Sequence, residues 1–377
     1  FIFKLACITL KDNFYQILNL MNVDSSTLKN YLTDIIGQLI NFLKANLKMK
    51  NDENDEYEFY AEFASDFLAS LMKNKPSLVT SCGKTIFLDY LNDPTFFVTT
   101  PKILSNMRKF ISLSVKEYPD ILGDLIRNIN SGFLFLGGND EDKIRTLRRI
   151  SFVIYSCKKD TFQKDFDNIK EKAKLFLTSY KDNSKLKGEI FLMMRVLFLR
   201  FSHEGVMKMI KDLWPIIFTE LIENIKDEKK QKDINLLIEC FKFIELLSLV
   251  NVEEFSLYQW IFLLDTFDMK DLDTTNPESL LSDLLKKESK IFRPIALNVI
   301  SEGDMKVDKS MIEGNHTGKS ELVVCPKNES LEDLQNAVKQ FFYSIGDMNN
   351  YKVEINYKQI EDIIEKDFLD DGNEKKK

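Results

Sequence analysis

Residues 232–250 constrain the fold more than any other part of the chain. Their polar side chains fall at spacings of three and four and form one narrow stripe, which consists of Asn235, Glu239, Lys242, Glu245 and Ser248. The remaining positions after the first turn are almost all apolar, so a helix here presents hydrophobic side chains around most of its circumference. Such a helix needs neighbours on several sides, and a packed array of helices provides them.

The rest of the chain has the composition of a helical protein. Its 377 residues include 30 phenylalanines but only 13 glycines and 8 prolines, and strand-and-turn proteins need more turn residues than this. The fold class that we predict is all-α, either a HEAT- or armadillo-like α-solenoid or another layered helical array, although no clean repeat is present. The periodicity predicts helices at 3–22, 27–48, 57–73, 81–92, 101–117, 119–130, 141–158, 162–181, 184–202, 205–225 with a kink at Pro215, 232–250, 253–268, 278–288, 330–345 and 357–370.

Changes in composition divide the chain into three parts. Residues 1–300 read as a helical-repeat array, and residues 301–328 are poor in large apolar side chains and read as a flexible linker or long loop, with at most a short strand at 322–324. Residues 329–377 read as C-terminal helices and a charged tail, and Ser330 and Asp333 have the spacing of a capping box. The chain starts at Phe1 rather than at methionine, so we expect a fragment or a partial gene model.

Charge and cysteine usage exclude several functional classes. The net charge of -7 and the pI near 5.3 argue against a nucleic-acid partner, which requires a basic footprint. The five cysteines are scattered and form no CxxC motif, so we expect a reducing compartment, no disulfide framework and no metal site. The longest apolar run, residues 190–199, is interrupted by Arg195 and is too short to span a bilayer, so we expect any membrane contact to be peripheral.

No motif in the chain carries catalytic chemistry. Residues 314–320 resemble a phosphate-binding loop, but three residues separate the two glycines where the true loop has four, and no clear strand precedes them. The two histidines, His203 and His316, lack any nucleophile-and-carboxylate setting around them. We therefore expect no catalytic residue and no cofactor.

One helix carries a candidate basic docking face, formed by Arg145, Arg148 and Arg149. Such a face could dock acidic side chains or anionic lipid headgroups. The alternative, which we favour, is a solvated face that pairs with the acidic residues 140–142.

The two tryptophans, Trp214 and Trp260, could be interface anchors or core residues. Trp214 precedes Pro215 and has Ile210 and Ile217 nearby, and Trp260 lies among leucines and isoleucines. Buried packing between helices is the reading that we favour for both rings.

Two stretches of the chain carry a family resemblance. The run LNDPTFF at residues 91–97 and the trio of helices around residues 213–221, 240–247 and 254–260 are similar to the C-terminal region of the Dopey family of Golgi and endosome trafficking scaffolds. The resemblance covers roughly residues 81–268, and the residues that carry it are packing residues, among them Trp214, Pro215, Phe241 and Trp260.

The resemblance implies a non-enzymatic protein that is cytoplasmic and peripheral on Golgi and endosome membranes and acts in transport between them. It implies two partners, a scaffold that resembles Arf exchange factors but lacks exchange activity, and an aminophospholipid flippase. In animals the family is also linked to kinesin-driven transport. Two alternatives stay open, namely an unrelated HEAT-type scaffold of the nuclear-transport or phosphatase kind, and an enzyme with a helical fold.

Overall fold

The computed structural model describes residues 8–14, 16–17, 25–48, 55–74, 76–117, 120–123, 140–179, 183–226, 233–250, 255, 319–320, 330–338, 341 and 354–369. The chain divides into two compact units. Unit 1 consists of Phe1–Ile169, Val196–Val206 and Glu365–Lys377, and unit 2 consists of Lys170–Arg195 and Met207–Ile364. The predicted domain boundaries at residues 300 and 328 fall outside the described residues and stay a prediction.

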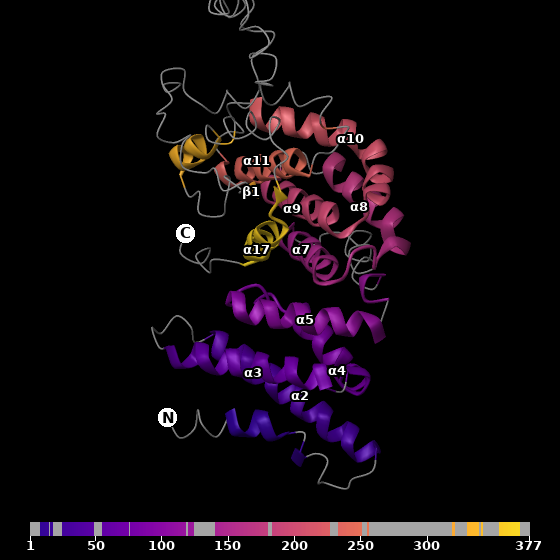
Figure 1. Cartoon of the computed structure of the whole chain (residues 1–377), viewed down its shortest axis with the longest axis vertical. Coiled ribbons are helices and arrows are strands. Elements are labelled where there is room, and N and C mark those ends of the chain that lie inside the picture. The colour runs from indigo at the N-terminus through magenta and orange to yellow at the C-terminus, as the bar shows by residue number, and fades with distance from the viewer. Residues whose placement is uncertain are drawn as a thin grey trace, which may run out of the picture. The chain divides into compact units, whose positions relative to one another are not determined.

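Unit 1 is a stack of helices in which α2 and α3 each contact both the next helix and the one after it. Helix α2 packs against α3 and α4, and α5 packs against α3, α4 and α7. Figure 1 shows α3 and α4 at one level, between α2 and α5. This is the contact pattern of helix pairs that stack on one another, as in an α-solenoid. The helices are α2 (Ser25–Lys48), α3 (Asp55–Asn74), α4 (Pro76–Leu91), α5 (Pro101–Glu117) and α7 (Asp140–Ser156).

Gly83 allows α4 to approach α2 closely, whereas a Cβ at Gly37 would meet only ordinary van der Waals contact. A Cβ atom on Gly83 of α4 would lie 3.2 Å from Cδ1 and Cγ2 of Ile36 in α2. A Cβ atom on Gly37 of α2 would lie 3.7 Å from Cδ1 of Ile86 in α4. Any side chain at Gly83 would therefore have to displace the buried Ile36.

A left-handed residue closes the loop that follows α7. Asp160 has a φ of 61°, a conformation that aspartate tolerates better than most residues. Its backbone N–H donates to the carbonyl of Arg200 at 2.8 Å, and its carboxylate accepts the backbone N–H of Ser202 at 2.7 Å. The loop thereby satisfies backbone groups at the end of α9.

Unit 2 contains most of α9 (Ser184–Arg200) and of α10 (His203–Lys226), whose adjoining ends belong to unit 1, and all of α11 (Ile234–Leu249). Short polar side chains cap the N-termini of α9 and α11. Asn183 accepts the N–H of Leu186 at 3.0 Å, and Asp233 accepts the N–H of Leu236 at 3.2 Å. The other elements are α8 (Phe166–Ser179), which begins in unit 1 after a 3-10 turn at Gln163–Asp165, and α17 (Tyr357–Asp367), which ends in unit 1.

The prediction of an all-α fold is confirmed. Strand structure among the described residues is limited to β1 (Lys319–Ser320) and β2 (Glu354–Ile355), which pair in parallel. The strand that we predicted at 322–324 lies outside the described residues. Helix α11 is buried around almost its whole circumference, as its pattern predicts, and even Lys242 and Glu245 of the polar stripe are buried.

Most predicted helices agree with the structure to within a few residues. The largest difference is α4, which begins at Pro76 rather than at residue 81, with the proline in the first turn, where its missing N–H costs least. Helix α10 continues through Pro215, as the predicted range 205–225 requires, and the kink at Pro215 stays a prediction. The capping box is confirmed, because Ser330 Oγ accepts the N–H of Asp333 at 3.1 Å while the Asp333 carboxylate accepts the N–H of Ser330 at 3.3 Å. The predicted helix at 278–288 and nearly all of that at 253–268 lie outside the described residues.

Candidate interaction surfaces

One carboxylate organises the turn between α4 and α5 in unit 1. Asp93 Oδ1 accepts the backbone N–H of Thr95 at 2.9 Å and the Thr95 hydroxyl at 2.6 Å. The same carboxylate forms an ion pair with Lys44 of α2. The turn is therefore tied to α2, and it places Phe96 and Phe97, both buried, in the core. The aspartate-proline-aromatic run at residues 91–97 thus acts in packing.

The environment of Asp93 stabilises its charged form. Burial alone would raise the pKa of this carboxyl, but the hydrogen bonds from Lys44 and Thr95 outweigh it and lower the pKa from 3.8 to about 2. Because the folded pKa lies below the unfolded one, the stabilisation is present above pH 4 and is lost as the pH falls from about 4 to about 2.

Replacing Asp93 by asparagine should therefore remove roughly 2 kcal/mol of stability near neutral pH. We expect the difference in unfolding free energy between the parent chain and the Asp93→Asn chain to shrink as the pH falls from about 4 toward 2. Thermal or urea unfolding at a series of pH values measures this difference, with Asp89→Asn on the exposed side of α4 as the control. A difference that stays constant down to pH 2 would contradict the assignment.

Of the three arginines of the predicted docking face, Arg149 is not on the surface. This side chain is buried, and its guanidinium donates to the carbonyls of Asn92 at 2.8 Å and Asp93 at 3.4 Å. Burial, together with the charge of Arg145, lowers the pKa of Arg149 to about 10. The turn at residues 92–93 covers the side of α7 on which Arg149 lies.

The other two arginines of that face are partly exposed. Arg145 pairs with Glu141 at 3.9 Å and with Asp142 at 3.6 Å on its own helix, as the alternative of a solvated face predicts. The Arg148 guanidinium lies 5.8 Å from the centre of the Phe97 ring. Whether these two arginines dock a partner stays a prediction.

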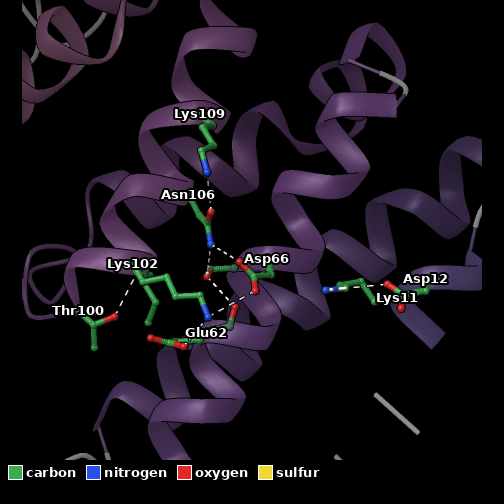
Figure 2. Close-up of polar contacts among 10 residues, drawn as sticks. Lys11, Asp12, Glu62, Asp66, Thr100, Lys102, Asn106 and Lys109 are labelled. Atoms are coloured by element: carbon green, nitrogen blue, oxygen red, sulfur yellow. Dashed lines mark hydrogen bonds and ion pairs between the residues drawn. The ribbon is translucent and has the colours of Figure 1, made fainter. Parts of the chain in front are cut away.

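Figure 2 shows a polar network that joins α3 to α5 in unit 1. Lys102 Nζ lies 2.7 Å from Glu62 Oε2 and 3.7 Å from Asp66 Oδ2. Asn106 donates to the same Asp66 at 2.6 Å and to the buried Ser65 hydroxyl at 3.0 Å. The hydrogen bond to Glu62 raises the pKa of Lys102. The network fixes the register of two neighbouring helices, and its charges are largely satisfied within the unit.

Of the family-like packing residues in unit 2, Trp214 and Phe241 are core residues. Trp214 is 7 % exposed, and its ring contacts Phe218 edge-on, with the ring centres 4.3 Å apart. Phe241 is fully buried in α11, whereas Pro215 is exposed on α10. Trp260 lies outside the described residues, so its burial stays a prediction.

Unit 2 also contains buried charges that sequence reasoning missed. Lys187 of α9 is 1 % exposed and lies 2.5 Å from the carboxylate of Glu220 in α10, which is 4 % exposed. Arg195 of α9 pairs with Glu239 of α11, and Lys242 lies 3.2 Å from the same carboxylate. The one available signal was Arg195, which interrupts the apolar run at residues 190–199.

The histidine and cysteines that the structure describes do not point to a catalytic or metal site. Within them, no three His, Cys, Asp or Glu side chains gather as metal ligands. His203 lies exposed in the first turn of α10, and His316 lies outside the described residues. Burial raises the pKa of the Cys157 thiol to about 12 and also raises that of Cys240, which disfavours the nucleophilic thiolate. In the part of the chain that is described, no helix is both long and apolar enough to cross a membrane.

One known protein family matches most of the chain. The family described as DOP1 C-terminal matches residues 9–352. The chain is 24% identical over 288 residues to "Protein DOP1 homolog" of Drosophila melanogaster. That alignment covers 61% of this chain and 10% of the fly protein. It is 30% identical over 173 residues to "Protein DOP1" of Saccharomyces cerevisiae, and that alignment covers 40% of this chain and 10% of the yeast protein.

Other relatives extend the match along the chain. The chain is 24% identical over 276 residues to "Protein dop1" of Emericella nidulans, covering 68% of this chain and 14% of the relative. The chain thus corresponds to only a small part of each of these relatives. No solved structure matches it significantly.

Proposed function

Because the chain belongs to the DOP1, or Dopey, family, we propose that it is part of a non-enzymatic scaffold that acts in protein transport between Golgi and endosomal membranes. The observation that carries the proposal is the family match over residues 9–352. Membership of this family removes the alternative of a HEAT-type scaffold of unrelated ancestry. The resemblance at residues 91–97 and in the trio of helices is confirmed at the level of the family.

The layered helical fold supports a role in binding other proteins. Stacked helices present long outer surfaces while their cores stay packed, which is how helical-repeat proteins bind partners. The partners that we propose are a scaffold resembling Arf exchange factors but lacking exchange activity, and an aminophospholipid flippase. Attachment to the membrane would be peripheral and depend on these partners and on surface charge.

Membrane fractionation of cells that express the tagged full-length protein tests this proposal. We expect the protein in Golgi- and endosome-enriched membranes and its release by about 1 M salt, because the Debye length falls to about 3 Å there. Co-precipitation of the exchange-factor-like scaffold from the same membranes measures the partner. Staining of the nuclear envelope, or retention through both salt and alkaline extraction, would contradict the proposal.

A further inference from the structure

Helix α2 carries two apolar seams, and only one of them is buried in unit 1. The buried seam consists of the core residues Leu32, Ile36, Ile40, Leu43 and Leu47. It packs against α3 and α4, with which α2 makes its contacts. A second seam runs along another side of the helix at alternating spacings of three and four residues. Its members are Leu28, Tyr31, Ile35, Gln38, Phe42 and Ala45. This heptad spacing is the one with which a helix packs along a neighbouring helix.

The second seam is exposed where its side chains are largest. Tyr31 is 44% exposed and Phe42 is 36% exposed, whereas Leu28 and Ile35 are half-buried. The Phe42 ring contacts Tyr60 of α3, with the ring centres 6.0 Å apart, so the exposed surface continues onto the next helix. The described part of unit 1 therefore leaves this seam incompletely covered.

The surface around the second seam is poor in charge. Among the exposed positions on this side of α2, Asp34 is the only charged residue. The others are Asn30, Tyr31, Gln38, Asn41, Phe42 and Ala45. Depletion of charge together with exposed aromatic rings is typical of the centre of an interface, whereas a solvated helix face is polar and charged.

The second seam lies at one end of the stack in unit 1. Within this stack, α3 and α4 lie between α2 and α5 (Figure 1). The helical residues 8–14 also pack on α3, because the Phe14 ring contacts Phe67 edge-on at 5.0 Å. Leu10 and Ile17, seven residues apart, are 47% and 41% exposed. The terminal layer of a helical stack needs a polar outer face for solubility, but this one exposes large apolar side chains.

The lengths of the relatives indicate what covers this end. The chain aligns with 10% of the fly relative and 10% of the yeast relative, and the family that matches it is described as a C-terminal region. Most of each relative therefore precedes the matching region. Consecutive helices of a stack lie side by side. Helices that precede the matching region would thus continue the stack at the end that holds α2.

We propose that the second seam of α2 is the interface between unit 1 and a helical layer formed by the preceding part of the full-length protein. The occupying helix would carry apolar side chains at heptad spacing and few charges. Tyr31 and Phe42 would insert between its turns as knobs into holes. The contact would join the C-terminal region to the rest of the protein as one continuous stack, wherever in the cell the protein acts.

Thiol labelling of the full-length protein tests whether the seam is covered. A maleimide should react with a Gln38→Cys thiol at least about tenfold more slowly than with an Asp89→Cys thiol on the exposed side of α4, because it reaches position 38 only when the layers open. In the isolated 377-residue chain the two thiols should react at similar rates. Mass spectrometry of the labelled peptides separates both sites from the native cysteines. Equal rates at the two sites of the full-length protein would overturn the proposal.

Photo-crosslinking identifies the occupant independently. Replacing Tyr31 by benzoylphenylalanine keeps an aromatic ring in the seam, and in the full-length protein it should give crosslinks to a segment that precedes residue 1 of this chain. Mixing isotopically light and heavy protein shows whether a crosslink joins one polypeptide or two. Crosslinks between two copies, or to a different protein, would overturn the proposal and assign the seam to that occupant instead.

Discussion

Replacing Lys187 by methionine should lower the free energy of unfolding by roughly 3–5 kcal/mol, because it leaves the Glu220 carboxylate buried without its partner. Both side chains are almost completely buried, and the two charged groups lie 2.5 Å apart. Desolvation makes each charge costly alone, and only the pair offsets that cost. Urea unfolding followed by circular dichroism measures the loss.

Two further variants separate the pair from the packing. Lys187→Met combined with Glu220→Met should recover most of the stability, since buried ion pairs replaced by apolar residues of similar volume are often neutral or better. Lys185→Met, at an exposed position of α9, should change the free energy by less than about 0.5 kcal/mol. A double variant that is as unstable as the sum of the two single changes would show that the charges do not act as a pair.

This ion pair marks the limit of what the sequence could predict. Periodicity was sufficient for the helices and for the burial of α11, because both depend on the pattern within one segment. Lys187 reads as an ordinary surface lysine in its own segment, and its burial depends on Glu220 from another helix. Such a partner across the fold leaves no local pattern in either helix.

Arg149 shows the same limit for the candidate site. Spacing places it on one face of α7 with Arg145 and Arg148, and nothing in residues 140–156 distinguishes it from them. The structure separates Arg149 from Arg145, because Arg149 donates to the carbonyls of Asn92 and Asp93 while Arg145 pairs with Glu141 and Asp142 of its own helix. The run at residues 91–97 was recognisable from its family likeness, but its contact with Arg149 was not. Likewise the Tyr155 hydroxyl donates to Glu365, 210 positions away in the sequence, which no local pattern reveals.

Replacing Trp214 by alanine should lower the free energy of unfolding by roughly 3–5 kcal/mol, as the removal of a large buried ring does. The side chain packs against Phe218 and, with ring centres 6.3 Å apart, against Phe255. Its indole Nε1 is buried and has no hydrogen-bond partner among the described residues. Trp214→Phe should therefore cost much less than Trp214→Ala, since it keeps an aromatic ring and removes the unpaired donor.

The same two variants decide whether Trp214 is a core residue or an interface anchor. If it is a core residue, co-precipitation of the proposed exchange-factor-like scaffold should fall with Trp214→Ala only in proportion to the unfolded fraction. Binding by the Trp214→Phe chain should stay near that of the parent. An anchor would behave differently, because truncating it would abolish binding while leaving the melting temperature nearly unchanged. A normal melt with lost co-precipitation would thus move the docking surface onto α10, against the 7 % exposure of this ring.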